Sequence, residues 1–196
     1  GVETSSNQDV DGVVISSNII TDCAEQCIKL SNGGTTNQHT GILITDNVMR
    51  QFLSDGHGIN IYDETGTKIV IRGNIIEGNK AGTDKAAIWF SRERSWSTDI
   101  FNNNFGNWDI GIQADYDTGT EEDWMIGIQC RMDENIFDNV TTCFQTRPVY
   151  CALGRSNVFR NCVPGFSQLR VPARFEDGLL NGYYVGALPA IKCRSG

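Results

Sequence analysis

The amino-acid sequence predicts an all-β solenoid, in which short parallel strands stack on one another along the chain. Two repeated patterns predict it: one with an asparagine in a fixed place, and a second with alternating apolar residues that follows the first. Composition is the third observation, because 21 glycines against 4 prolines in 196 residues are typical of many tight turns between short strands. A chain of this length is expected to form one domain with a sizeable core.

The first pattern places an apolar residue three positions before an asparagine, and apolar residues usually follow that asparagine. The six asparagines are Asn18, Asn47, Asn74, Asn103, Asn135 and Asn157, so that by subtraction they lie 29, 27, 29, 32 and 22 residues apart. In the sixth unit Gly154 replaces the apolar residue. Asparagine tolerates unusual backbone angles in turns, and stacked amides bond to one another. We therefore expect a ladder of stacked asparagines.

The second pattern is a small residue, an apolar residue, a variable residue and usually another apolar one. It begins at Cys27, Gly58, Ala87, Gly111 and Cys143. Its period of two predicts a strand with one buried face. Such units cannot bury their own apolar residues and must stack, which predicts a solenoid of about six coils. The expected core includes Ile15, Ile28, Ile44, Ile59, Ile71, Ile88, Ile112 and Phe144.

The two ends of the chain differ from the repeat. We expect residues 1–166 to form the solenoid and residues 167–196 to form a non-repeating tail, which caps the open end or contacts another chain. Residues 1–11 are too polar and too few for a capping helix. Because unpaired strand edges invite pairing, we expect that preceding residues were removed or that other chains cover this edge. A homotrimer is the expected assembly.

Charge and cysteine usage exclude several functions. The formal charge of −8 repels phosphate backbones, so nucleic acid is not an expected partner. No apolar run is long enough to cross a membrane. The 7 cysteines lack a C-x-x-C pattern, and Cys27 and Cys143 occupy the small position of the repeat, which favours reduced, packing cysteines over a disulfide framework. We expect neither a metal nor a cofactor.

The repeat resembles a known family. The step from Ile15 to Asn18-Ile-Ile, its five relatives, and strands such as Gly58-Ile-Asn-Ile resemble the repeats of the pectin-lyase-like right-handed parallel β-helix superfamily, over residues 12–166. The resemblance implies three strands per right-handed coil, with the asparagine between the second and third. It also implies a substrate groove along the first strand. The superfamily includes lyases, hydrolases, epimerases, bacteriophage tailspikes and structural proteins, so the resemblance indicates fold more than activity.

A solenoid that has an uncapped first coil and assembles as a trimer most resembles a bacteriophage tailspike or appendage. This resemblance implies a location in a virion tail or outside the cell. It also implies a bacterial surface polysaccharide as substrate or receptor.

Alternation along the first strand predicts which side chains face outward. One column contains Lys29, Asn60, Trp89, Gln113 and Gln145, the next contains Ser31, Tyr62, Ser91, Asp115 and Arg147, and a third contains Glu64, Glu93 and Asp117. Aromatic rings beside amides and carboxylates are typical of carbohydrate sites. We expect substrate contacts from Trp89, Tyr62, Asn60, Gln113 and Arg147. A plain solvated face is the alternative.

Glycoside hydrolysis requires two carboxyl groups, and an inverting mechanism places them about 6.5–9.5 Å apart. Strand spacings put Asp115 roughly 6.5–7 Å from Asp117 and about 8 Å from Glu93. The sequence therefore predicts Asp115 as the central catalytic carboxylate, with Glu93 or Asp117 as its partner. A spike segment that only binds a glycan, and a polysaccharide lyase that uses Tyr62 with Arg92 or Arg147, are the alternatives. His57 fits either the lyase base or a plain turn residue.

Overall fold

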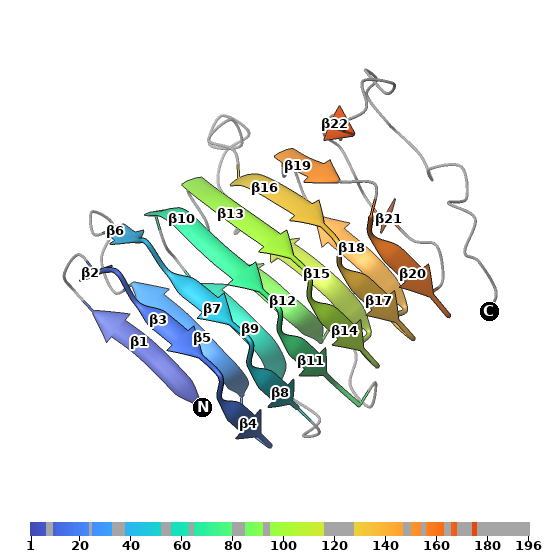
Figure 1. The fold of residues 1–196 in the computed structure, drawn as a ribbon, viewed down its shortest axis with the longest axis horizontal. Coiled ribbons are helices and arrows are strands. Elements are labelled where there is room, and N and C mark those ends of the chain that lie inside the picture. The colour runs from blue at the N-terminus through green and yellow to red at the C-terminus, as the bar shows by residue number, and fades with distance from the viewer. Residues whose placement is uncertain are drawn as a thin grey trace.

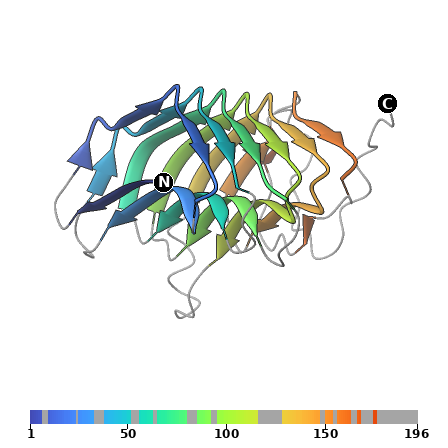
Figure 2. The ribbon, with the colours of Figure 1, turned by 90° about the horizontal axis from the view of Figure 1, so that it is seen from below.

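A computed structural model shows an all-β solenoid built from parallel strands, as the two patterns predict (Figure 1). It describes residues 1–6, 10–23, 25–32, 38–51, 56–62, 65–79, 85–91, 95–115, 128–146, 150–153, 156–162, 166–167 and 174–175. These described residues contain no helix of the length and apolar character needed to cross a membrane. Three parallel sheets run along the long axis, and their strands repeat in the same order (Figure 2).

The first sheet contains the strands of the alternating pattern. In spatial order they are β1 (Val2–Ser6), β5 (Gln26–Asn32), β9 (His57–Tyr62), β12 (Ala86–Ser91), β15 (Ile110–Asp115), β18 (Thr142–Thr146) and β21 (Phe166–Ser167). Strand β1 lies within residues 1–166, which the sequence predicts to form the solenoid, although its residues do not show the alternating pattern. Val2 pairs with Ile28, and Gly1 precedes Val2 as Cys27 precedes Ile28. Thr4 breaks the apolar alternation, which is why the pattern alone did not include this strand.

The second and third sheets contain the strands on either side of the ladder asparagine. The second contains β2 (Val10–Asp11), β6 (Gln38–Thr40), β10 (Thr65–Arg72), β13 (Ser95–Phe101), β16 (Ile128–Asp133), β19 (Tyr150–Leu153) and β22 (Arg174–Phe175), with β3 (Val14–Ser16) and β7 (Leu43–Thr45) beside them. The third contains β4 (Ile19–Thr21), β8 (Val48–Arg50), β11 (Ile75–Glu77), β14 (Asn104–Gly106), β17 (Ile136–Asp138) and β20 (Val158–Arg160). Of the proposed tail, the described residues are Ser167 in β21 and Arg174–Phe175 in β22, which pair with β18 and β19.

The six asparagines form the expected ladder at the corner between the second and third sheets. The side-chain amide of each donates to the next, from Asn18 through Asn47, Asn74, Asn103 and Asn135 to Asn157, at 2.9–3.0 Å. Each acceptor oxygen also takes the backbone N–H of the preceding asparagine, as Asn74 does from Asn47 at 3.0 Å. The second amide proton of Asn74 reaches the carbonyl of Ile44 at 3.0 Å. The ladder therefore satisfies buried polar groups of the corner.

The turns before the first five ladder asparagines adopt a left-handed backbone conformation. Positive φ angles occur at Ser17 (57°), Asp46 (56°), Gly73 (65°), Asn102 (55°) and Glu134 (56°), each directly before a ladder asparagine. For a residue other than glycine this conformation costs roughly 1–2 kcal/mol. Four of these five residues are not glycine. The hydrogen bonds of the asparagine ladder, which follows each turn, therefore offset this cost.

The core confirms the predicted inward positions. All eight predicted residues are buried, and the inward column of the third sheet adds Ile20, Met49, Ile76, Phe105 and Phe137. Toward the C-terminus this column is aromatic: Phe137 lies 4.8 Å from Phe105 and stacks on Phe159 at 5.2 Å between ring centroids. Stacked equivalent side chains are the expected outcome of units that bury their apolar faces against each other.

The third-sheet column explains the small residue that opens each first-sheet strand. A Cβ atom added to Gly111 would approach the ring of Phe137 to 2.9 Å and the carbonyl oxygen of Cys143 to 2.7 Å. At Gly58 it would approach the side chain of Ile76 to 2.6 Å. Glycine at these two positions thus leaves room both for the backbone of the neighbouring strand and for the inward side chains of the third sheet.

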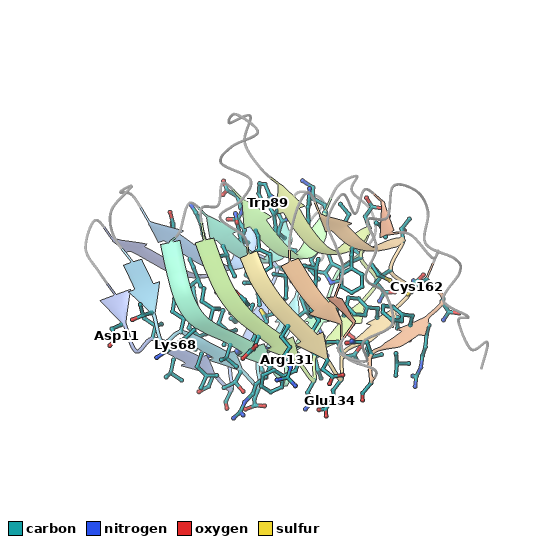
Figure 3. The ribbon with its side chains drawn as sticks, turned by 90° about the horizontal axis from the view of Figure 1, so that it is seen from above. Asp11, Lys68, Trp89, Arg131, Glu134 and Cys162 are labelled. Carbon is teal, nitrogen blue, oxygen red and sulfur yellow. The ribbon has the colours of Figure 1, made fainter. Side chains whose placement is uncertain are left out.

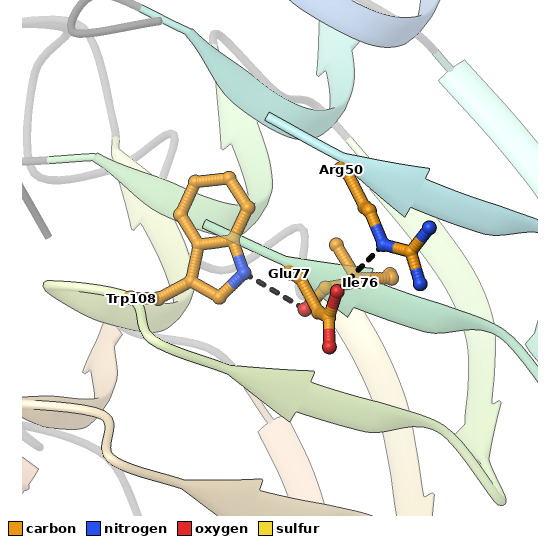
Figure 4. Close-up of polar contacts among 4 residues, drawn as sticks. All are labelled: Arg50, Ile76, Glu77 and Trp108. Carbon is orange, nitrogen blue, oxygen red and sulfur yellow. Dashed lines mark hydrogen bonds and ion pairs between the residues drawn. The ribbon is translucent and has the colours of Figure 1, made fainter. Parts of the chain in front are cut away.

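A further corner is shaped by Trp108, which follows β14. Its buried indole donates from Nε1 to the carbonyl of Ile76 at 2.9 Å (Figure 4). A Cβ on Gly78 would approach the same indole to 2.7 Å, so glycine is required beneath the ring. On the outer face nearby, Arg50 pairs with Glu77 at 2.8 Å across β8 and β11. Both groups are well exposed, so this ion pair contributes little stability.

The ladder gives a first testable prediction. Asn74→Ala should lower the free energy of unfolding by about 3 kcal/mol, because it leaves buried donors and acceptors of neighbouring residues unsatisfied. Asn18→Ala, at the exposed end of the ladder, is the matched control and should cost about 1 kcal/mol or less. Urea denaturation measures both. Equal losses for the two variants would contradict a ladder that stabilises the interior.

Candidate functional site

The first sheet brings the predicted outward columns into register. Trp89 of β12 pairs with Asn60 of β9 on one side and with Gln113 of β15 on the other. Lys29 and Gln145 extend the same column in the two directions. Lys29 also forms an ion pair with Glu3 of β1 at 3.1 Å. The column predicted from alternation therefore exists as a continuous row across neighbouring strands.

The second predicted column follows at the ends of the same strands. Ser31 pairs with Tyr62, Tyr62 with Ser91, and Ser91 with Asp115, which is the last residue of β15. The structure describes the backbone of Tyr62 and Asp115 and not their side chains. The other predicted residues at this end of the sheet lie outside the described residues: Glu64, Glu93, Asp117 and Arg147.

Trp89 is the central aromatic residue of the row. Its ring stacks on the imidazole of His57, with centroids 4.4 Å apart and planes inclined by 29°. Figure 3 shows Trp89 on the side of the solenoid opposite Arg131 and Glu134. The side chain is half-buried, so the pair holds the indole in one orientation while part of it stays accessible.

The predicted exposure of Asn60 and Gln113 is wrong. The two residues occupy the expected column, but they are only 2% and 6% exposed. A large ring stands between them at the strand spacing of about 4.8 Å, which reduces the access of water to shorter amide side chains on either side. The two side chains therefore lie in the row beside Trp89 but present little surface to a ligand.

His57 is a strand residue with a structural contact that the sequence analysis did not identify. It opens β9 and is buried, and its Nδ1 accepts the backbone N–H of Ala86 at 3.1 Å. Burial, followed by the positive charge of Lys85, lowers the pKa of His57 to about 4. An unprotonated Nδ1 is also what accepting the Ala86 N–H requires. At neutral pH the imidazole is thus neutral, with its proton on Nε2.

The sequence contained a signal for this residue. Register places Gln26, His57, Ala86, Ile110 and Thr142 in one column, directly before the small residues of the repeat. Ala86 and Ile110 are buried like His57. A histidine in a column of otherwise uncharged residues indicates a packed, neutral imidazole. The two glycines beside His57 favour a turn instead, and the structure places the residue in strand β9.

The four cysteines whose side chains are described are free and buried, as predicted: Cys23, Cys27, Cys143 and Cys162. Within the described residues, no group of three or more His, Cys, Asp or Glu side chains is arranged to hold a metal ion.

Comparison with models of known protein families, with curated proteins and with solved structures gives no match to this chain. The function must therefore be argued from the residues of the site.

His57 gives a second prediction. Its folded-state pKa of about 4 lies below the ordinary value of 6.5, so the unfolded chain binds the proton first as pH falls. Stability should therefore be lost between pH 6.5 and pH 4, by about 2–3 kcal/mol from this group. His57→Asn removes the titration and keeps an acceptor for the Ala86 N–H. Urea unfolding of both proteins at pH 7 and pH 4.5 measures the difference.

Carboxylates also titrate in this range, so the comparison between the two proteins is the deciding quantity. The stability of the wild type should fall relative to His57→Asn between the two pH values. An unchanged difference would show that the imidazole is not buried as described.

Proposed function

We propose that the outward face of the first sheet binds a polysaccharide of a bacterial surface and hydrolyses it, with Asp115 as the central carboxylate. The observation that supports this proposal best is Trp89, a half-buried indole on an otherwise polar row, oriented by His57. Sugar rings have apolar faces that pack on aromatic rings. A ring that is already held in place loses little conformational entropy when a ligand binds.

The position of Asp115 relative to Trp89 supports the catalytic part of the proposal. Gln113 pairs with Trp89, and Asp115 follows two residues later on the same strand. From strand spacings, the Cα atom of Asp115 lies about 8 Å from that of Trp89. In a regular strand, residues two apart point to the same face. A sugar packed on Trp89 therefore has a neighbouring glycosidic bond within the range of this carboxylate.

In the proposed mechanism Asp115 activates a water molecule for attack on the sugar. Glu93 or Asp117 is the proposed partner, kept protonated so that it gives its proton to the leaving oxygen. Tyr62 and Arg147 are proposed as further substrate contacts, whereas Asn60 and Gln113 are too buried to be among them. No cofactor takes part in this proposal.

The finer description of the fold belongs to the same proposal. We propose a right-handed solenoid of about six coils, related to the pectin-lyase-like superfamily and most similar to a bacteriophage tailspike. Six ladder asparagines support the coil number, and the strong right-handed preference of connections between parallel strands supports the handedness. A virion tail or extracellular location follows from this relationship.

A binding-only spike segment is the second candidate, and one observation favours it. The described part of the two outward columns contains one carboxylate near Trp89, Asp115, while Glu3 lies on β1 at the far end of the sheet. Hydrolysis needs two carboxyl groups. A lyase is a third candidate, but His57 gives it little support because its Nδ1 accepts a backbone hydrogen bond.

A depolymerisation assay against a panel of capsular and O-antigen polysaccharides separates the three candidates. New reducing ends without new ultraviolet absorbance indicate hydrolysis, and absorbance from an unsaturated uronate indicates a lyase. Binding without cleavage indicates the spike segment.

Site variants give a third prediction. Asp115→Asn should reduce turnover by roughly 10²–10⁴-fold with nearly unchanged binding, because it removes a proton-transfer role. Trp89→Ala should mainly weaken binding of the glycan. Asp99→Asn, on an exposed position of β13 in the second sheet, is the matched control and should behave as the parent. Parental turnover by Asp115→Asn would reject Asp115 as the catalytic residue.

Assembly gives a fourth prediction. Multi-angle light scattering of the chain at micromolar concentration should give the mass of a homotrimer, about three times the 21.7 kDa of one chain. A mass of one chain at that concentration would contradict the trimer and leave the glycan assay unaffected.

A further inference from the structure

A row of mostly apolar side chains lies on the outside of the third sheet, from β4 to β20 (Figure 1). We call it the outer row, and its members pair in register on six neighbouring strands: Ile19, Val48, Ile75, Asn104, Ile136 and Val158. The next residue of each strand is the inward one, so the outer row faces away from the core. Ile19 is 77% exposed, and Ile75 and Val158 are 39% and 40% exposed.

The exposed apolar surface of the solenoid is concentrated in this row. In the part of the chain that the structure describes, four large apolar side chains are exposed, and three of them belong to the outer row. The fourth, Val14, lies on β3 in the second sheet. At the usual strand spacing the outer row is about 24 Å long. Single exposed apolar residues need no explanation, whereas a continuous row of them marks an interaction surface.

Asn104 is the one polar member of the outer row, and it indicates how a second copy of the chain would lie. Its neighbours in the row are Ile75 and Ile136. An amide that becomes buried in an apolar interface needs a hydrogen-bond partner. A copy that runs in the same direction at the same level supplies its own Asn104, as a single asparagine does in coiled-coil interfaces. A copy that runs in the opposite direction along the same row would place Ile75 against Asn104 instead.

Opposite charges on the two sides of the outer row also favour another copy of this chain as the partner. Arg72 on β10 and Glu77 on β11 flank the row at the level of Ile75, on the second and third sheets. Arg72 is exposed, and half-buried Glu77 pairs with Arg50 of its own chain at 2.8 Å. In a ring of copies that run in the same direction, the third sheet of one copy faces the second sheet of the next. Glu77 of one copy then lies at the level of Arg72 of the next.

We propose that the outer row is the subunit interface of this protein, where the rows of three copies meet along a three-fold axis parallel to the solenoid. This inference rests on the homotrimer proposed above and adds the face through which it forms. Five layers of the interface are apolar, and the layer of Asn104 is held by hydrogen bonds between the three amides. Trp89 lies on the first sheet, a different wall from the outer row, so the assembly leaves the candidate glycan site accessible.

The experiment introduces a carboxylate into the outer row and measures mass by multi-angle light scattering at micromolar concentration. Ile75→Glu places three like charges together on the axis, so the mass should fall threefold, to that of one chain. Ile19→Glu should act in the same direction and raise the concentration needed for the trimer by roughly tenfold or more. Val14→Glu is the matched control, because Val14 is 61% exposed and lies outside the row, and it should keep the parental mass.

Circular dichroism shows which variants are folded. Ile19 is more exposed than Ile75, so Ile19→Glu keeps the test decisive if Ile75→Glu does not fold. A trimer that survives the folded row variants would overturn this interface and leave the homotrimer itself in place. Equal dissociation by Val14→Glu would overturn the assignment to the outer row.

A parental mass of one or two chains would overturn both the homotrimer and this interface. None of these outcomes depends on glycan cleavage, which the depolymerisation assay tests separately.

Discussion

The hydrogen bonds between buried asparagine amides are the constraint on which the rest of this structure depends. At Asn74 the side chain accepts two hydrogen bonds from Asn47 and donates to Asn103 and to backbone carbonyls. Each rung is therefore complete only when the neighbouring rungs are in place. This mutual dependence fixes the register between units, because a shift of one residue would separate every amide from its partner. It also holds the left-handed turns that precede the asparagines.

The register that the asparagine ladder sets between units determines which side chains point outward from the first sheet. At Gly58 and Gly111, which open two first-sheet strands, the neighbouring strand and the inward column of the third sheet leave no room for a larger residue, as the close approach of Phe137 at Gly111 illustrates. That requirement fixes which residues then point outward. It places Trp89 between Asn60 and Gln113, with Asp115 at the end of the neighbouring strand. The candidate site is thus a consequence of core packing on the opposite wall.

Much of the fold could be predicted from the sequence, because the ladder asparagines and the inward isoleucines repeat in fixed places. The columns of the first sheet followed from alternation for the same reason. The burial of Asn60 and Gln113 and the stacking of His57 on Trp89 could not be predicted. They depend on side-chain directions and ring size, which a periodic pattern does not contain.

Hydrogen exchange of the asparagine amides tests the central role of the ladder most directly. Backbone N–H groups of Asn47, Asn74 and Asn103 donate to side-chain oxygens of the next asparagine at 3.0–3.1 Å, inside the protein. Nuclear magnetic resonance of the ¹⁵N-labelled chain should show these backbone amides, and the side-chain amides bonded with them, among the slowest to exchange. Protection should decrease toward the more exposed Asn18. Fast exchange at Asn74 and Asn103 while the neighbouring strand amides stay protected would contradict the account.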